Sequence, residues 1–168
     1  MSIDPELYKS GMRRLAAGVS IVTSLGSDGP RGMTATAICS VSVSPPTVLC
    51  CVNRTASPHA AIRASGVLAI NLLARADQAL ADRFAAAETG EPRFGTGGWT
   101  RLQTGAPILE TALAAFDCRV VETVDGASHS IFIAEVVEVR CSEAVAPLLY
   151  CNGGYGDFVA TETLTSGG

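Results

Sequence analysis

The chain has 168 residues, a length that fits one domain with a sizeable core, and we expect residues 1–168 to form a single domain. Hydrophobic residues make up 48% of it, yet no uninterrupted apolar run approaches the roughly 20 residues that a membrane-spanning helix needs. The formal net charge is −4 and Lys9 is the only lysine, so a nucleic-acid partner is disfavoured on electrostatic grounds. The first residues are not a basic segment followed by an apolar one, so we expect no signal peptide.

The cysteine content indicates free thiols rather than disulfides or a metal site. The six cysteines are Cys39, Cys50, Cys51, Cys118, Cys141 and Cys151. Most of them lie in apolar or β-branched runs, so we expect reduced, buried thiols and a cytoplasmic location. There is no C-x-x-C motif and the only histidines are His59 and His129, which disfavours a structural zinc site.

The first predicted elements are a helix and a hairpin. A helix is predicted over Pro5–Ala17, with Asp4 as its N-cap, a proline in its first position and Gly18 as its end. The segment Val19–Leu25 then predicts a strand. The turn Gly26–Pro30 leads into the next strand, so the two strands form a hairpin.

The stretch Gly32–Arg54 contains the strongest pattern in the sequence. Hydroxyl side chains fall on one parity and apolar side chains on the other, which predicts one strand with a polar and an apolar face. The hydroxyl set is Thr34, Thr36, Ser40, Ser42 and Ser44, interrupted by Ile38, and the apolar set is Ala35, Ala37, Cys39, Val41 and Val43. Pro45-Pro46 ends this strand, and the apolar run Val48–Val52 predicts a fully buried one. The alternative is that the hydroxyls cover the solvated face of an edge strand.

The turn Asn53–His59 follows and opens a short helix. Ser57 is a good N-cap and Pro58 suits the first position of a helix over His59–Ala64 that ends at a glycine. The free N–H groups at a helix N-terminus can bind phosphate, and Arg54 would add a charge-assisted donor. The hydroxyl row and this cationic turn together suit a ligand with a polar ring edge and a phosphate. The alternative is an ordinary capped helix with a surface arginine.

The second half of the chain predicts further strands and one more helix. The predicted strands are Val67–Leu73, Leu113–Val124, Ser130–Arg140 and Pro147–Cys151, with a hairpin turn at Asp125-Gly126. An amphipathic helix is predicted over Asp77–Ala86, because apolar residues recur there every four positions. The segment Glu88–Gly105 is the least regular, contains the only tryptophan, Trp99, and has the length of loops that are often functional. The tail Thr161–Gly168 is expected to fray.

The predicted fold class is mainly β with two or three short helices and mostly antiparallel strands. The strands Val48–Val52 and Ile131–Val139 are apolar on both faces. A closed or partly closed barrel, covered outside by helices or by a second subunit, would explain such strands.

Motifs of the common cofactor and nucleophile sites are missing. The glycines of Gly95–Gly98 have the wrong spacing for a dinucleotide-binding G-x-G-x-x-G and follow no predicted strand, which disfavours a Rossmann dehydrogenase. A Walker phosphate loop and a G-x-S-x-G elbow are also absent. Cysteine–histidine catalysis would need Cys39 or Cys51 to meet His59 in an accessible, electropositive setting, whereas these thiols are predicted to be buried in strands.

The string GMTATAICSVSVSPPTVLCCVNRTASPH, residues 32–59, resembles the signature of the flavin reductase family, the small partners of two-component flavin monooxygenases. The resemblance extends over residues 8–157. It implies a Greek-key split β-barrel that forms a homodimer with a flavin site at the subunit interface. It also implies an NAD(P)H:flavin oxidoreductase that reduces FMN or FAD and supplies the reduced flavin to a separate monooxygenase. Because such an enzyme mainly holds and orients the flavin, a row of binding residues suffices without a catalytic triad.

The resemblance also assigns roles to individual residues. Against the flavin ring and ribityl chain it places Thr34, Ala35, Thr36, Ala37, Ile38, Ser40 and Val41. Further flavin contacts, including those to the phosphate, would come from Cys51, Val52, Asn53, Arg54, Ser57, Pro58, His59, Arg83 and Phe84. The nicotinamide would meet His129, Gly153, Gly154, Tyr155 and Gly156, with His129 as the catalytic residue.

Three of these assignments have simple structural alternatives. His129 could merely finish a hairpin turn, and Ser128 precedes it where the family has an acid. Arg83 could belong to a solvated helix face, and the glycine-rich segment Gly153–Gly156 could be a tight surface turn.

Two other functions are compatible with the sequence. One is a flavin-binding protein or electron carrier on the same fold, without appreciable turnover. A weaker one is an enzyme similar to pyridoxamine-phosphate oxidase, whose phosphate-rich substrate would call for more cations than this lysine-poor chain has. The sequence does not distinguish FMN from FAD or NADH from NADPH, and it does not identify the partner oxygenase.

Overall fold

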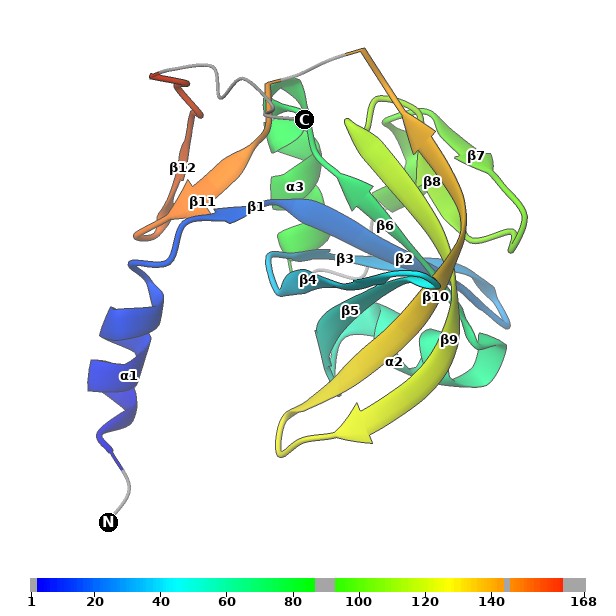
Figure 1. The fold of residues 1–168 in the computed structure, drawn as a ribbon, viewed down its shortest axis with the longest axis horizontal. Helices are drawn as coiled ribbons and strands as arrows, with labels where there is room; N and C mark the ends of the chain where they lie inside the picture. Colours follow the sequence, from blue (N-terminus) through cyan, green and yellow to red (C-terminus); the bar gives the residue numbers. More distant parts are fainter. Residues whose placement is uncertain (1–2, 87–92, 144–145, 162–168) are drawn as a thin grey trace.

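The computed structural model describes residues 3–86, 93–143 and 146–161. Its main feature is an antiparallel seven-stranded sheet with the spatial order β3-β2-β6-β9-β10-β5-β4 (Figure 1). These strands are β2 (Ser20–Gly26), β3 (Gly29–Ala35), β4 (Ile38–Val43), β5 (Pro46–Asn53), β6 (Val67–Leu72), β9 (Ala114–Asp125) and β10 (His129–Cys141). Two smaller sheets consist of β1 (Ala17–Gly18), β11 (Leu149–Cys151) and β12 (Gly154–Gly156), and of β7 (Trp99–Arg101) and β8 (Pro107–Leu109).

Three short α-helices accompany the sheets in the described part of the chain. They are α1 (Pro5–Met12), α2 (Ser57–Ser65) and α3 (Gln78–Ala85), with single 3₁₀ turns at Arg75–Asp77 and Arg93–Gly95. The predicted mainly β class with short helices is therefore confirmed. None of the helices in these ranges has the length and apolar character that crossing a membrane requires.

Four predicted strands agree with the structure to within one residue at each end. They are the segments observed as β2, β6, β9 and β10, and the predicted β2–β3 hairpin pairs Gly26 with Gly29. These segments combine β-branched or aromatic residues with turn signals at both ends, so local sequence was sufficient to place them.

The prediction of one continuous strand over Gly32–Ser44 is wrong. The chain leaves β3 at Ala35 and enters β4 at Ile38, and these two strands are the opposite edges of the seven-stranded sheet. The link Thr36-Ala37 crosses from one edge to the other, where the Ala37 carbonyl accepts a hydrogen bond from Cys51 N–H (3.0 Å). The sheet must therefore curl strongly, although it stays open between β3 and β4. Period-2 alternation continues across such a break, so the pattern could not reveal it.

Both faces of the sheet are covered, which explains why its central strands are apolar on both parities. One core cluster holds Ile21, Ala69 and Phe84, together with residues of α3 and β8. The other holds Val22 and Ile70, together with residues of α2 and β10. Because successive residues of β2 and β6 alternate between these clusters, each strand contributes side chains to both layers.

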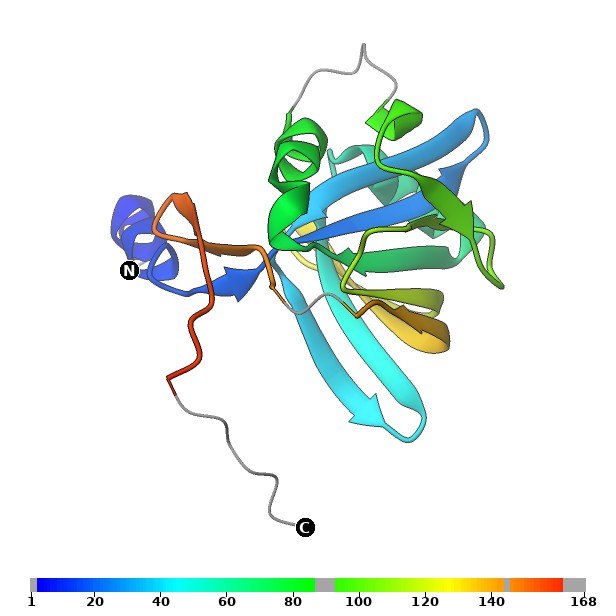
Figure 2. The same cartoon turned by 90° about the horizontal axis from the view of Figure 1, so that it is seen from above.

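The β4–β5 hairpin extends away from the rest of the sheet (Figure 2). Val43 is 88% exposed and Val41 is 51% exposed, so the predicted apolar face of β4 contacts solvent in a single chain. The prediction that Val48–Val52 is fully buried is also wrong, since only Cys50 and Val52 are buried there. At this end the hairpin has no covering layer among the described residues, and burial therefore alternates.

Helix α1 lies beside the small β1–β11–β12 sheet, to one side of the main body (Figure 1). Asp4 caps it by accepting a hydrogen bond from Glu6 N–H (3.0 Å), and a proline occupies the first turn as predicted. The helix ends at Met12 rather than Ala17, because the chain from Ala17 joins β1 and pairs with β11. None of its side chains is buried.

Three further predictions concern the two ends of α2 and the C-terminal tail. Ser57 is the first residue of α2 rather than its N-cap, and Ala56 precedes the helix without a side-chain cap. Gly66 ends α2 in a left-handed conformation (φ 68°), as the sequence suggested. The tail predicted to fray lies outside the described residues from position 162 onwards.

Candidate functional site

A cavity of about 410 Å³ lies between β3, α3 and the β11–β12 hairpin. Its lining includes Thr34, Ala35 and Thr36, which the family resemblance assigns to a flavin, and Gly153 and Tyr155, which the resemblance assigns to a nicotinamide. These two groups come from opposite ends of the chain. The fold therefore brings part of each predicted set to one cavity.

The Tyr155 side chain is fixed at the wall of this cavity. Its hydroxyl donates a hydrogen bond to Asp82 Oδ1 of α3 (2.7 Å), and its ring meets that of Tyr150 edge-on, with centroids 5.6 Å apart. Burial, followed by the hydrogen bond and charge of Asp82, raises the pKa of Tyr155 to about 12. Tyr155 is therefore a protonated donor at neutral pH and joins β12 to α3.

The hydroxyls of β3 are not equivalent. Thr34 Oγ1 donates to the Ala81 carbonyl of α3 (2.6 Å), so this side chain holds the strand to the helix. Ala35 is buried, whereas Thr36 and Ala37 are exposed in the link that follows. Thr36 therefore carries the hydroxyl that a ligand at this end of the cavity can reach.

A second cavity of about 440 Å³ adjoins the first on the side of α1. It shares Thr36 and Tyr150 with the first cavity and is also lined by Ala37. The remaining predicted flavin residues of β4, namely Ile38, Ser40 and Val41, line neither cavity and lie on the β4–β5 hairpin.

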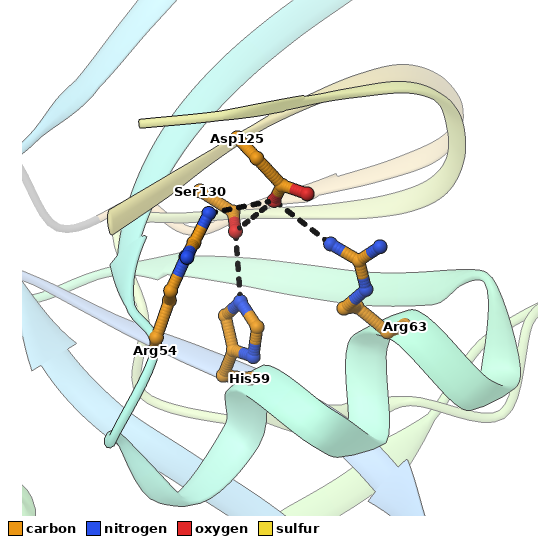
Figure 3. Close-up of polar contacts among 5 residues, drawn as sticks. All are labelled: Arg54, His59, Arg63, Asp125 and Ser130. Carbon is orange, nitrogen blue, oxygen red and sulfur yellow. Dashed lines mark hydrogen bonds and ion pairs between the residues drawn. The ribbon is translucent and has the colours of Figure 1, made fainter. Parts of the chain in front are cut away.

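A polar cluster forms where the β5–α2 turn meets the β9–β10 hairpin (Figure 3). Asp125 Oδ1 accepts hydrogen bonds from Ser130 Oγ (2.7 Å) and Arg63 Nη1 (2.8 Å). Arg54 Nη2 lies 3.7 Å from the same oxygen, and His59 Nε2 lies 2.9 Å from the buried Ser130 hydroxyl. One carboxylate thus holds two arginines and, through a serine, a histidine.

The hydrogen-bond directions in this cluster define the state of its imidazole. Since Ser130 donates to Asp125, its oxygen accepts from the Nε2–H of His59, so in the neutral ring the proton is on Nε2 and Nδ1 has none. Burial and then the nearby Arg63 and Arg54 lower the pKa of His59 from its ordinary 6.5, against the opposing effect of Asp125. The hydrogen bond from Ser130 is the largest cause that lowers the pKa of Asp125. At neutral pH the ring is therefore neutral and the carboxyl group ionised.

This arrangement is not that of a hydrolytic triad. In a triad the histidine lies between the nucleophile and the acid, whereas here Ser130 lies between His59 and Asp125 and is 0% exposed. The prediction that the thiols are buried is correct only for Cys50 and Cys118, and burial raises the pKa of each to about 12. Of the two cysteines considered for catalysis, Cys51 is half-buried and Cys39 is exposed, so the prediction is wrong for Cys39, as it is for Cys141 and Cys151. His59 bonds to serine, and its ring packs edge-on against Phe132.

The remaining predicted residues of the β5–α2 turn have mostly structural contacts. Asn53 Oδ1 accepts from Thr55 N–H and Oγ1 (both 2.9 Å), which fixes the turn. Val52 is buried in the core, and Pro58 is also buried. Cys51 is half-buried and Ser57 exposed.

His129 lies at the start of β10, directly opposite Asn53 of β5 in the register. Its ring is exposed, and Nδ1 is 2.9 Å from the Ser128 hydroxyl. It lines neither the cavity of Tyr155 nor the adjoining one. A single copy of the chain therefore does not bring His129 together with the predicted nicotinamide segment Gly153–Gly156.

Arg83 and Phe84 face different surroundings. Phe84 is 2% exposed and packs against the rings of Phe94 and Trp99, at centroid distances of 5.1 and 5.5 Å. Arg83 lines a third cavity of about 430 Å³, together with Ala79 and other residues on the other side of α3. No other residue predicted for the flavin or the nicotinamide lines that cavity.

Sequence reasoning missed four residues that shape these sites, namely Arg63, Asp82, Asp125 and Ser130. Asp125 stands before a glycine and was interpreted only as part of a turn. Ser130 falls on the inward parity of β10, next to buried apolar positions, and a lone hydroxyl there was a signal that it needs a partner. Asp82 and Arg63 have partners distant in sequence, which no local pattern shows.

Comparisons of the sequence with known proteins match one family along most of the chain. Residues 12–158 match the family model described as flavin reductase like domain. An FMN reductase (NADH) RutF of Agrobacterium fabrum is 45% identical over 148 residues, covering 88% of this chain and 85% of the relative. The corresponding protein of Variovorax paradoxus is 40% identical over 153 residues, covering 91% of this chain and 85% of the relative.

Solved structures with the same fold carry related descriptions. The NADH:FAD oxidoreductase SgcE6 of Streptomyces globisporus, in complex with NAD and FAD fragments, superposes with a TM-score of 0.87 at 30% identity, covering 97% of this chain and 99% of that one. BorF, the flavin reductase component of a bacterial two-component tryptophan halogenase, superposes with a TM-score of 0.83 at 32% identity, covering 92% and 98%.

Proposed function

The chain belongs to the flavin reductase like domain family, and on this premise we propose that it catalyses the reduction of FMN by NADH. Relatives at 40–45% identity are named FMN reductase (NADH), which favours this flavin and this nicotinamide over FAD and NADPH. The proposal takes residues 1–168 as one functional domain.

The cavity between β3, α3 and β12 is the observation that carries the proposal. Two redox rings can exchange a hydride only in contact, so their binding residues must share one space. Thr36 from the β3–β4 link and Tyr155 from the β11–β12 hairpin line the same cavity of about 410 Å³. Their convergence supports a site in which flavin and dihydronicotinamide meet.

The residues present suit a flavin. Val19, Ala35 and Ala85 provide apolar wall for a flat ring, and the accessible Thr36 hydroxyl provides a hydrogen bond for its polar edge. A bound flavin supplies the hydride-accepting ring. The chain itself contributes placement: Tyr155, held by Asp82, fixes one wall, and Thr34, bonded to Ala81, fixes the wall beside it.

We extend the proposal to a homodimer built on a Greek-key split barrel. The strongly curled sheet and its two-residue link between edge strands support the barrel. The dimer is supported by the exposed apolar side of α1 and by the exposed valines of the β4–β5 hairpin. In one chain, neither Asp125 nor the proposed catalytic His129 lines the cavity of Tyr155. A second copy would allow the polar cluster of Asp125 and His129 to complete that cavity.

The proposed physiological role is to supply reduced flavin to a separate monooxygenase. BorF, a structural relative, is described as the flavin reductase component of a two-component halogenase. A cytoplasmic location is proposed because all six cysteines are free in the structure, which is the usual state in a reducing compartment.

A steady-state assay that crosses FMN and FAD with NADH and NADPH tests the proposed function. We expect rapid NADH oxidation that depends on added FMN and saturates with it. A yellow protein that keeps its flavin without exchange would instead support the carrier function. Absence of flavin-dependent oxidation with all four pairs would contradict the proposal.

A further inference from the structure

The two adjoining cavities have opposite charge. Asp82 is the charged residue that lines the cavity of Tyr155, whereas Lys9 and Arg13 are the charged residues that line the cavity beside α1. The cavities meet at Thr36 and Tyr150. A ligand that extends through both would therefore pass from an acidic wall to a basic one.

The backbone beside the basic wall is tied to the β11–β12 turn, and one of its cations has no ion-pair partner among the described residues. The Arg13 carbonyl accepts a hydrogen bond from Asn152 N–H (2.6 Å), which ties the end of α1 to the β11–β12 turn. Lys9 Nζ lies 2.7 Å from Glu6 Oε1, in an exposed pair along the helix. Arg13 forms no ion pair with any residue in the described ranges, so its guanidinium is available to an anion.

A reduced nicotinamide dinucleotide has the matching order of charges. Its nicotinamide ring is neutral and becomes cationic when the hydride leaves, which suits the cavity with Asp82. Its diphosphate is anionic, and arginine binds phosphate oxygens through paired, charge-assisted hydrogen bonds. Tyr8, Met12 and Leu15 also line this cavity, so apolar wall lies between its two cations, and the Tyr8 ring offers an aromatic face for a base.

We propose that the cavity beside α1 binds the diphosphate of NADH, with Arg13 as the main contact and Lys9 as the second. The inference rests on the proposed function, because it takes the nicotinamide ring to enter the neighbouring cavity. The structural alternative is that both cations only complement the negative end of the α1 dipole. In that role they would affect helix stability and not the choice of hydride donor.

The test compares NADH with 1-benzyl-1,4-dihydronicotinamide, a donor that has the ring and lacks the diphosphate, with FMN as acceptor. We expect Arg13→Gln to lower kcat/KM for NADH about tenfold and Lys9→Gln to lower it less. The value for the truncated donor should stay within about twofold. Arg14→Gln is the matched control, since Arg14 is the adjacent cation and lines neither cavity.

If Arg13→Gln lowered kcat/KM equally for both donors, or for neither, the proposal would be overturned. The proposal would also be overturned if Arg13→Gln raised the KM for FMN but not the KM for riboflavin, which has no phosphate. The cations would then bind the flavin phosphate. Calorimetric titration with ADP-ribose separates this inference from the proposed function, since it needs no turnover. Weaker ADP-ribose binding by Arg13→Gln than by the wild type supports the diphosphate site even if the wild type fails to reduce flavin.

Discussion

At the scale of single residues, Asp125 organises the polar cluster at the end of β9. Its carboxylate accepts from Ser130 and Arg63, and Arg54 completes its surroundings. These contacts connect β9, β10, α2 and the turn before α2. A phosphate approaching this turn would meet two arginines already neutralised in part by a carboxylate, together with a neutral His59. The turn is therefore less cationic than its sequence suggests.

The lowered pKa of His59 predicts a pH dependence of stability. Because the pKa of the folded state lies below the ordinary 6.5, the unfolded chain binds more protons just below pH 6.5. The free energy of unfolding should therefore fall as pH decreases from 7 through this region. Urea unfolding at a series of pH values should show a flatter profile for His59→Gln than for the wild type. A profile of equal slope in the variant would count against this assignment.

At the scale of elements, buried polar side chains fasten the β7–β8 segment to the main sheet. Thr23 Oγ1 donates to the Pro107 carbonyl (2.6 Å), and Asn71 Oδ1 accepts from Leu109 N–H (2.8 Å). Asp117, 0% exposed, accepts from Thr104 N–H (2.7 Å). No buried side-chain nitrogen or oxygen in the described part of the chain lacks a partner. Because losing such a partner costs about 1–3 kcal/mol, these bonds hold the segment over one core cluster.

The packing of α3 on β3 depends on a glycine. A Cβ added at Gly32 would lie 2.7 Å from Phe84 Cε1, and the Phe84 ring is enclosed by Phe94 and Trp99. Gly32→Ala should therefore lower the free energy of unfolding by about 1–3 kcal/mol through overpacking. Gly18→Ala is the control, since a Cβ there meets nothing within 4 Å. Chemical denaturation of both variants checks this, and equal stabilities would show that the Phe84 ring shifts at no cost.

At the scale of the whole molecule, exposed apolar side chains occur on α1 and on the β4–β5 hairpin at one edge of the main sheet. On α1, Leu7 is 62% exposed and Met12 48% exposed, and Val43 at the β4–β5 hairpin is 88% exposed. Short helices gain most of their stability from packing of an apolar side. An isolated helix of eight residues with no buried side chain would be marginal, which supports contact with a second copy.

A charge on the apolar side of α1 should therefore weaken the proposed homodimer. We expect Leu7→Glu to shift the protein towards monomer in light scattering coupled to size-exclusion chromatography, and to lower flavin reduction in parallel. Ser10→Glu adds the same charge at a polar position of the same helix and should leave the dimer intact. If Leu7→Glu elutes as the wild type does, α1 is not part of an interface.

Local sequence was sufficient to predict the strands and helices whose residue pattern is bounded by turn or glycine signals. The strand β6 and the hairpin β9–β10 follow from β-branched runs bounded by turns, and α2 ends where a glycine adopts φ 68°. The string of residues 32–59 was sufficient for the family, which the match over residues 12–158 confirms. These properties depend on neighbours along the chain, so they can be predicted from it.

Only the tertiary structure decided where the chain changes its partner strand and which polar and charged side chains meet. The Thr36-Ala37 link crosses between sheet edges without interrupting the alternation, so the pattern continues through a point where the partner strand changes. The bonds of Tyr155 to Asp82 and of Asp125 to Arg63 join residues 73 and 62 positions apart. Side chains so distant in sequence meet because the fold packs α3 beside β12 and α2 beside β9, and such packing depends on the whole chain rather than on any one strand.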